Sequence, residues 1–172
     1  MSWIDYAEDV FTNAGPTGNP AYFYTQDTGV SERNVPSNVS VDAWLDYIFS
    51  ADAGSSRWSF QFDVTGGKTN EVSSDAMAFP HRDSIYFMTA YASSNGETSG
   101  KTIKFINEAV LKLQNNKPDE SLSYVGVASL AHGKDAQKRY WGANLPKLER
   151  IKAALDFDDV FSTLQYVKPA SL

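Results

Sequence analysis

Apolar and polar residues follow two different periods along this chain, and each period predicts a type of element. From Arg57 to Val64 aromatic and polar residues alternate, which is typical of a half-buried strand. The run from Ser84 to Ala92 is apolar on both faces and predicts a central strand. After Ser40, apolar residues recur at spacings of three and four, so we expect Ser40 to cap a helix that ends before Gly54.

Weaker patterns predict the other elements. Helices are expected at 4–11, about 102–115, about 134–140 and 146–155, strands at 21–25 and 123–130, and a loop at 27–40. Strands mixed with helices in this order favour the α+β class, with an antiparallel sheet and helices packed on one face. The other face is then expected to form a pocket or a dimer interface. We find no repeat or linker and expect residues 1–172 to form a single domain.

Composition and charge exclude several functions. The 172 residues have a formal net charge of −6, whereas nucleic-acid binding normally needs a basic stripe, so no nucleic-acid partner is expected. The chain has no cysteine, which excludes disulfides and thiol catalysis within it. No apolar run approaches the roughly 20 residues of a membrane-spanning helix, and the acidic start does not resemble a secretion signal. We therefore expect a cytoplasmic protein without a membrane partner.

Two histidines are the residues most suited to proton transfer near neutral pH. His81 belongs to the tightest polar cluster, His81-Arg82-Asp83, which is either catalytic or a structural group before the strand. His132 lies in a glycine-flanked loop and is expected at the surface. The two histidines are far apart and have no ligand spacing, so no metal site is predicted.

The C-terminal motif YWGANLPKLERIKAALDFDDVF resembles the end of the FAD-linked oxidases of the berberine-bridge-enzyme family. Its paired aromatics with glycine, Asn144, the Ile151-Lys152 pair and the final Val160-Phe161 are similar in order and spacing. Upstream, FDVTGGKTNEVSSDAMAFPHRD is similar to the family's Gly-Gly hairpin and its His-Arg motif before a strand. The resemblance runs from about Tyr22 to Gln165. It implies the substrate-binding domain of this family, without its FAD-binding domain.

The same resemblance implies a pocket on one side of the sheet. Its polar residues would be Gln61 and Asp63 on one strand and Thr89 and Tyr91 on the next, unless these side chains simply decorate a solvated face. Aromatic residues are expected in the core or the pocket wall. The candidate catalytic residues are His81, Asp63 and Tyr91, and the candidate substrate-binding residues are Tyr24, Trp58, Gln61, Thr89 and Tyr124.

Departures from the family pattern affect the expected chemistry. Relatives carry Tyr-x-Asn-Tyr where this chain has Tyr124-Val125-Gly126-Val127, so an amide and an aromatic hydroxyl are replaced. The residues offer no nucleotide cradle, and no cofactor is expected. We therefore predict a cofactor-independent isomerase or cyclase that acts on a small apolar or polyketide-like substrate in natural-product biosynthesis, as a homodimer. The alternatives are a non-catalytic accessory protein or the substrate-binding half of a split FAD-dependent oxidoreductase.

Overall fold

The computed structural model describes residues 2–5, 8, 22–54, 56–114, 122–163 and 165–170. Within these ranges three antiparallel strands form one sheet in the order β1-β3-β2. They are β1 (Tyr22–Ser31), β2 (Arg57–Val64) and β3 (Ser84–Ser94). The prediction that the apolar segment after Ser84 is a central strand is confirmed, because β3 pairs with both of its neighbours. The predicted α+β class is confirmed as well.

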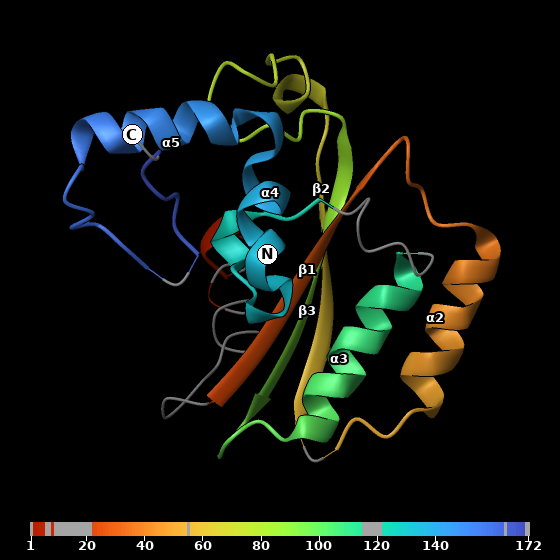
Figure 1. The fold of residues 1–172 in the computed structure, drawn as a ribbon. Helices are drawn as coiled ribbons and strands as arrows, with labels where there is room; N and C mark the ends of the chain where they lie inside the picture. Colours follow the sequence, from red (N-terminus) through yellow and green to blue (C-terminus); the bar gives the residue numbers. More distant parts are fainter. Residues whose placement is uncertain are drawn as a thin grey trace.

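Two helices cover one face of the sheet, as Figure 1 shows. They are α2 (Asn38–Ser50) and α3 (Gly100–Leu113). The hydroxyl of Ser37 accepts the backbone N–H of Ser40, so α2 begins three residues earlier than predicted. The core lies between these helices and β3, and every member of it is apolar. Its buried residues are Trp44, Ile48, Met88, Ala90, Ala92, Phe105, Ile106, Ala109, Val110 and Leu113.

Aromatic contacts join the edge strand β2 to the same helices. The ring of Trp44 on α2 meets Phe60 edge-on at 5.2 Å, and Trp58 lies 5.3 Å from Phe105 on α3. The alternation in β2 therefore places its aromatic residues toward the helices. Its polar residues Ser59, Gln61 and Asp63 point to the opposite side of the sheet.

The predicted loop at 27–40 is wrong at its start, because β1 continues to Ser31. Asp27, Thr28 and Ser31 are buried there despite their polar side chains. They are accommodated because β3 pairs with their backbone, and the side chains of Asp27 and Thr28 form hydrogen bonds with other segments of the chain. Gln114 Nε2, for example, donates to Thr28 Oγ1 at 2.9 Å.

The predicted strand at 123–130 is also wrong. This segment forms the short helical turns η3 (Val125–Val127) and η4 (Leu130–Asp135), after one isolated bridge between Leu122 and Gly29. Pairing with β1 stops there because the Asp27 carboxylate, rather than a strand carbonyl, accepts the N–H of Tyr124. The chain then crosses the face of the sheet opposite α2 and α3.

The C-terminal helices are close to the prediction. They are α4 (Ala136–Trp141) and α5 (Leu145–Leu155), joined by the turn η5 (Gly142–Asn144). Another short turn, η1 (Gly67–Thr69), follows the Gly66-Gly67 pair that ends β2. Residues 3–5 and 8 are helical, and the rest of the helix predicted at 4–11 lies outside the described residues. None of the described helices is long and apolar enough to cross a membrane.

Candidate functional site

The face of the sheet opposite α2 and α3, called here the second face, contains a small cavity. The strand registers place Asp27, Asp63 and Thr89 on this face, one from each strand. All three line a cavity of about 250 Å³. Aromatic residues form part of its wall, and the remaining lining residues are Thr65, Thr69, Phe79, Phe87, Tyr124 and Val127.

The aromatic wall of the cavity is a packed cluster. The ring of Phe79 lies 6.1 Å from that of Phe87 and 6.0 Å from that of Tyr124. Tyr124 and Phe87 also contact each other, at 6.4 Å. These rings come from three segments, the loop before β3, β3 itself and the turn after Leu122. The wall is therefore a product of tertiary packing.

Asp63 is the carboxylate of the cavity on the edge strand. Gln61 lies two residues away on the same face of β2, and its Nε2 donates to both carboxylate oxygens, at 2.9 and 3.1 Å. This pair of contacts orients the carboxylate along the sheet. Together with the hydroxyls of Thr65, Thr69 and Thr89, it gives one side of the cavity several hydrogen-bonding groups.

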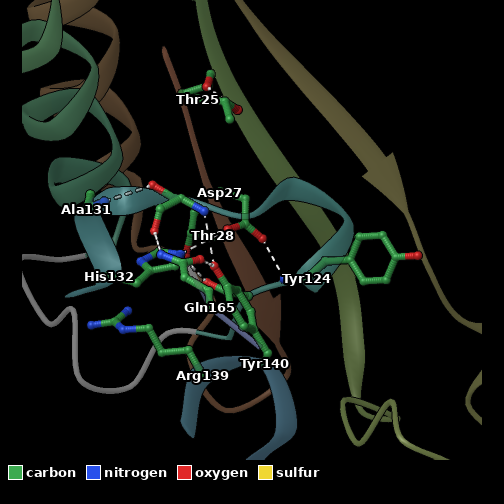
Figure 2. A network of polar contacts seen from close by, with 12 residues as sticks. Thr25, Asp27, Thr28, Tyr124, Ala131, His132, Arg139, Tyr140 and Gln165 are labelled. Carbon is green, nitrogen blue, oxygen red and sulfur yellow. Dashed lines mark hydrogen bonds and ion pairs between the residues drawn. The ribbon is translucent and has the colours of Figure 1, made fainter. Parts of the chain in front are cut away.

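Asp27 is the second carboxylate, and it belongs to a buried network (Figure 2). Its side chain is 0% exposed. One oxygen accepts the backbone N–H of Tyr124 at 2.6 Å, and the other lies 3.2 Å from Nε2 of His132. The same His132 nitrogen is 2.9 Å from Oγ of Ser123. Asp27 therefore fixes the turn that carries the Tyr124 ring into the cavity wall.

The network continues to the C-terminal segment. The hydroxyl of Tyr140 accepts the N–H of Ser129 at 3.1 Å and donates to Oε1 of Gln165. Gln165 Nε2 in turn donates to the carbonyl of Ser129. Tyr140 is buried, and burial raises the pKa of its hydroxyl. These bonds tie α4 and the residue Gln165 to the segment that crosses the second face.

His132 shows that one expectation from sequence is wrong. It was expected at the surface, but it is 6% exposed and packs against Tyr140. A glycine-flanked loop is usually exposed, but here the segment 122–135 covers part of the sheet. His132 contacts Ser123 and Asp27 through the same ring nitrogen, Nε2. The cluster is therefore not arranged as a Ser-His-Asp relay, in which the serine and the aspartate contact different ring nitrogens.

His81 does not line the cavity, but its ring packs against the lining residues Phe79 and Phe87, at 5.4 and 6.3 Å. Its Nε2 donates to the carbonyl of Arg139 at 2.7 Å, and burial lowers the pKa of the ring. A neutral ring whose Nε2 donates to a backbone carbonyl ties the loop before β3 to α4. His81 also lines a separate, larger groove beside α4.

The other candidate residues divide between the two faces. Gln61 and Tyr91 lie on the second face, where Tyr91 stacks on Phe23 with ring centroids 5.9 Å apart. Tyr24 and Trp58 point to the helices instead. The hydroxyl of Tyr24 donates to Asn107 of α3 at 2.7 Å, and burial raises its pKa. The structure thus brings Asp63, Thr89 and Tyr124 together around the cavity and separates Tyr24 and Trp58 from it.

Sequence reasoning missed six of the nine residues that line the cavity: Asp27, Thr65, Thr69, Phe79, Phe87 and Val127. Phe87 lies within a predicted strand and Thr65 directly follows one, so their alternation with neighbours on the helix face could have placed them on the second face. Asp27 carried no such signal because a buried carboxylate looks like a loop residue in the sequence. Its role depends on Tyr124 and His132, which lie about a hundred positions away.

Neither the cavity nor the groove has the size and the lining of an FAD-binding site. The cavity of about 250 Å³ is smaller than the roughly 300–1,000 Å³ of sites that enclose drug-sized ligands. The groove is larger, at about 1070 Å³, but no Phe, Tyr or Trp lines it to stack against an isoalloxazine ring. The described residues also include no cluster of three metal-binding side chains.

The fold is that of part of an FAD-linked oxidase, as comparisons with known proteins show. A family model described as berberine and berberine like matches residues 104–168. The FAD-linked oxidoreductase sorD of Penicillium rubens is 28% identical over 162 residues, which are 93% of this chain and 34% of that protein. Glucooligosaccharide oxidase of Sarocladium strictum is 32% identical over 163 residues, 86% of this chain and 32% of that protein.

Solved structures support the same conclusion. The crystal structure of glucooligosaccharide oxidase from Acremonium strictum matches with a TM-score of 0.80 and 27% identity over all of this chain and 39% of that one. Xylooligosaccharide oxidase from Myceliophthora thermophila shares the fold at the same TM-score with 21% identity. The chain therefore contains a berberine-like domain segment and has the fold of part of the FAD-linked oxidases. It spans about a third of the length of the curated relatives that it matches.

Proposed function

We propose that this chain forms the substrate-binding part of an FAD-linked oxidase, and that the cavity on the second face holds a hydroxyl-bearing part of the substrate. One observation carries the proposal: Asp63 and Thr89 face an aromatic wall across a cavity of about 250 Å³. The fold around this cavity is that of FAD-linked oxidases. The described residues contribute binding and orientation, because they offer no cradle for the flavin.

The chemistry of the lining supports a substrate that has both polar edges and apolar faces. Carboxylate and threonine oxygens accept hydrogen bonds from ligand hydroxyls, while Phe79, Phe87 and Tyr124 offer ring surface to C–H groups. Several relatives are named for carbohydrate substrates, including the glucooligosaccharide and chitooligosaccharide oxidases. An apolar or polyketide-like substrate with one hydroxyl group would fit the same lining.

Asp63 is the residue we assign to the substrate hydroxyl. The family pattern places an aromatic hydroxyl near Val127, but here that position lines the cavity with an apolar side chain. Asp27 already accepts the Tyr124 N–H and contacts His132. Asp63 keeps lone pairs available because its partner Gln61 donates from a single nitrogen. Its role is to accept a hydrogen bond from the substrate hydroxyl and thereby orient the C–O bond.

The test is ligand binding by calorimetry with maltotriose and a hydroxylated aromatic compound. Asp63→Asn should weaken binding about 10- to 100-fold, because a hydrogen bond to a charged group contributes about 1.5–3 kcal/mol. Asp52→Asn is the matched control, since Asp52 is an exposed carboxylate that pairs with Lys101 near α3. Equal affinity in the two variants, or no binding of either probe to the wild type, would contradict the proposal.

The cofactor-independent isomerase or cyclase expected from sequence is the competing function. The relatives reported above are named as oxidases or oxidoreductases, so they support the oxidase family and not this finer reaction. A flavin-free preparation that rearranged a hydroxylated polyketide without consuming oxygen would favour the isomerase. A preparation that bound substrate without converting it would favour the substrate-binding role.

Exposed apolar residues at the end of the chain support association with a second copy. Leu155, Phe157, Val160 and Phe161 are each at least 71% exposed. Surfaces with this many exposed large apolar side chains are uncommon on monomers. We expect a dimer by light scattering after size exclusion, and a monomer for the double variant Phe157→Ser, Phe161→Ser. A wild-type monomer at high concentration would refute this association.

A further inference from the structure

The larger groove, lined by two segments that are distant in sequence, is distinct from the cavity of the proposed substrate site. The loop before β3 forms one wall, and α4 with η5 forms the other. Of the candidate site residues only His81 lines it. Its volume is about 1070 Å³, which is ample for a small ligand and its water.

Buried polar side chains hold the two walls of the groove together. Asn144 donates from Nδ2 to the carbonyls of Ser74, Met77 and Ala78, at 2.6, 3.0 and 3.3 Å. His81 donates to the carbonyl of Arg139 at 2.7 Å. Both side chains are buried. The groove is therefore a built feature with fixed walls, since one amide and one imidazole crosslink its floor.

The charge of the groove is opposite to that of the chain. Four cationic residues line it, Arg33, Arg82, Lys138 and Arg139, against the two carboxylates of Asp83 and Asp135. Four positive and two negative charges leave an excess of two positive charges, on a chain whose formal net charge is −6. Asp83 is already engaged by Arg33 in an ion pair. The cations Arg82 and Lys138 line the groove together with one further carboxylate, that of Asp135.

Arg82 is held in place without any ligand. Its guanidinium lies 5.0 Å above the ring of Phe79, and its Nη1 donates to the carbonyl of Thr69 at 3.0 Å. A guanidinium has five N–H donors in a planar fork that matches carboxylate and phosphate oxygens. Because the fork is positioned beforehand, little rotamer entropy is lost when an anion binds.

We propose that this groove binds the oxyanion group of a small ligand, either a phosphate or a carboxylate, through Arg82 and Lys138. The cavity binds neutral hydroxyl groups in the proposed function, so the two sites recognise different chemistry and are tested separately. The groove gives this acidic chain a local anion site of fixed shape. Its affinity should fall as salt rises, because exposed charges are screened within about 10 Å at 0.1 M ionic strength.

The experiment titrates the protein with inorganic phosphate and, separately, with malonate at low salt and neutral pH, with detection by calorimetry and amide chemical shifts. Binding of either anion supports the site, and the tighter one identifies the group. Lys138→Gln and Arg82→Gln should each weaken binding about fivefold or more, the effect of one charge at contact distance in water. Lys104→Gln is the charge-matched control, on α3 at the other face of the sheet.

A gain of affinity provides a test that misfolding cannot imitate. Asp135 is an exposed carboxylate of the groove, so Asp135→Asn removes a repulsive charge without disturbing the core. It should tighten anion binding about twofold to fivefold. The proposal is overturned if neither anion saturates, if Lys104→Gln weakens binding as much as Lys138→Gln, or if Asp135→Asn leaves the affinity unchanged.

Discussion

Replacing Asp27 by alanine tests the buried network that positions the cavity wall. Alanine leaves the N–H of Tyr124 without its acceptor, and of the two polar contacts described for His132 it leaves only the one to Ser123. A buried polar group that loses its partner costs about 1–3 kcal/mol, and Asp27 is the partner of two such groups, the Tyr124 N–H and the His132 ring. We therefore expect Asp27→Ala to lower the free energy of unfolding by about 3–5 kcal/mol.

That loss is a large share of the roughly 5–15 kcal/mol by which a domain is stable. Asp27→Asn should cost less, about 1–2 kcal/mol, because the amide oxygen still accepts the Tyr124 N–H while the charge is lost. Tyr124 should also leave the cavity wall in the alanine variant, so binding of the cavity ligand should weaken even where the variant is folded.

The assay is urea unfolding followed by circular dichroism, with the slope against denaturant compared between variants. Asp42→Ala is the control, since Asp42 is exposed on α2 and its loss should change stability by less than about 0.5 kcal/mol. If Asp27→Ala lost no more than Asp42→Ala, the carboxylate would not stabilise the fold. If it lost about 3–5 kcal/mol but ligand binding stayed intact, the positioning of Tyr124 would be refuted.

Two further predictions concern residues near the site. Gly29→Ala would place a methyl group 2.6 Å from Phe87 and 2.8 Å from Leu122, so it should cost about 1–3 kcal/mol. Thermal unfolding should then show a lower midpoint than for Gly96→Ala, where nothing lies within 4 Å, and equal midpoints would refute the crowding. Burial lowers the pKa of His81 below its ordinary 6.5, so the unfolded chain binds more protons there. Stability should fall as pH drops below about 6.5, and less steeply in His81→Gln; equal slopes in urea unfolding would contradict this.

Local patterns predicted much of the fold because their physical causes are local. The alternation of β2 and the apolar run of β3 reflect side-chain direction along a strand, which depends on neighbouring residues. The helix predicted at about 102–115 likewise corresponds to α3. The errors came where tertiary contacts override local preference: residues 27–31 joined β1, and 123–130 did not form a strand.

The site was predicted in part, through the resemblance to the oxidase family. That resemblance implied that Asp63 and Thr89 lie on one face of the sheet, and the strand registers place both of them there. Tyr24 and Trp58 were assigned to a pocket wall, yet they pack against α3, because an aromatic residue in a core and one in a pocket have the same sequence signature. His132 was taken for a surface residue because its partners Asp27 and Tyr140 belong to other segments.

The sequence by itself determined the elements with strong periodicity, the acidic net charge, the absence of cysteine and the motifs of a flavoprotein family. The tertiary structure alone decided which face of the sheet is open and that Asp27 and His132 meet inside the protein. It also gathered four cations beside α4 on an acidic chain. The physical reason is that burial, cavities and local charge arise from contacts between distant segments, and periodicity records only the contacts within one.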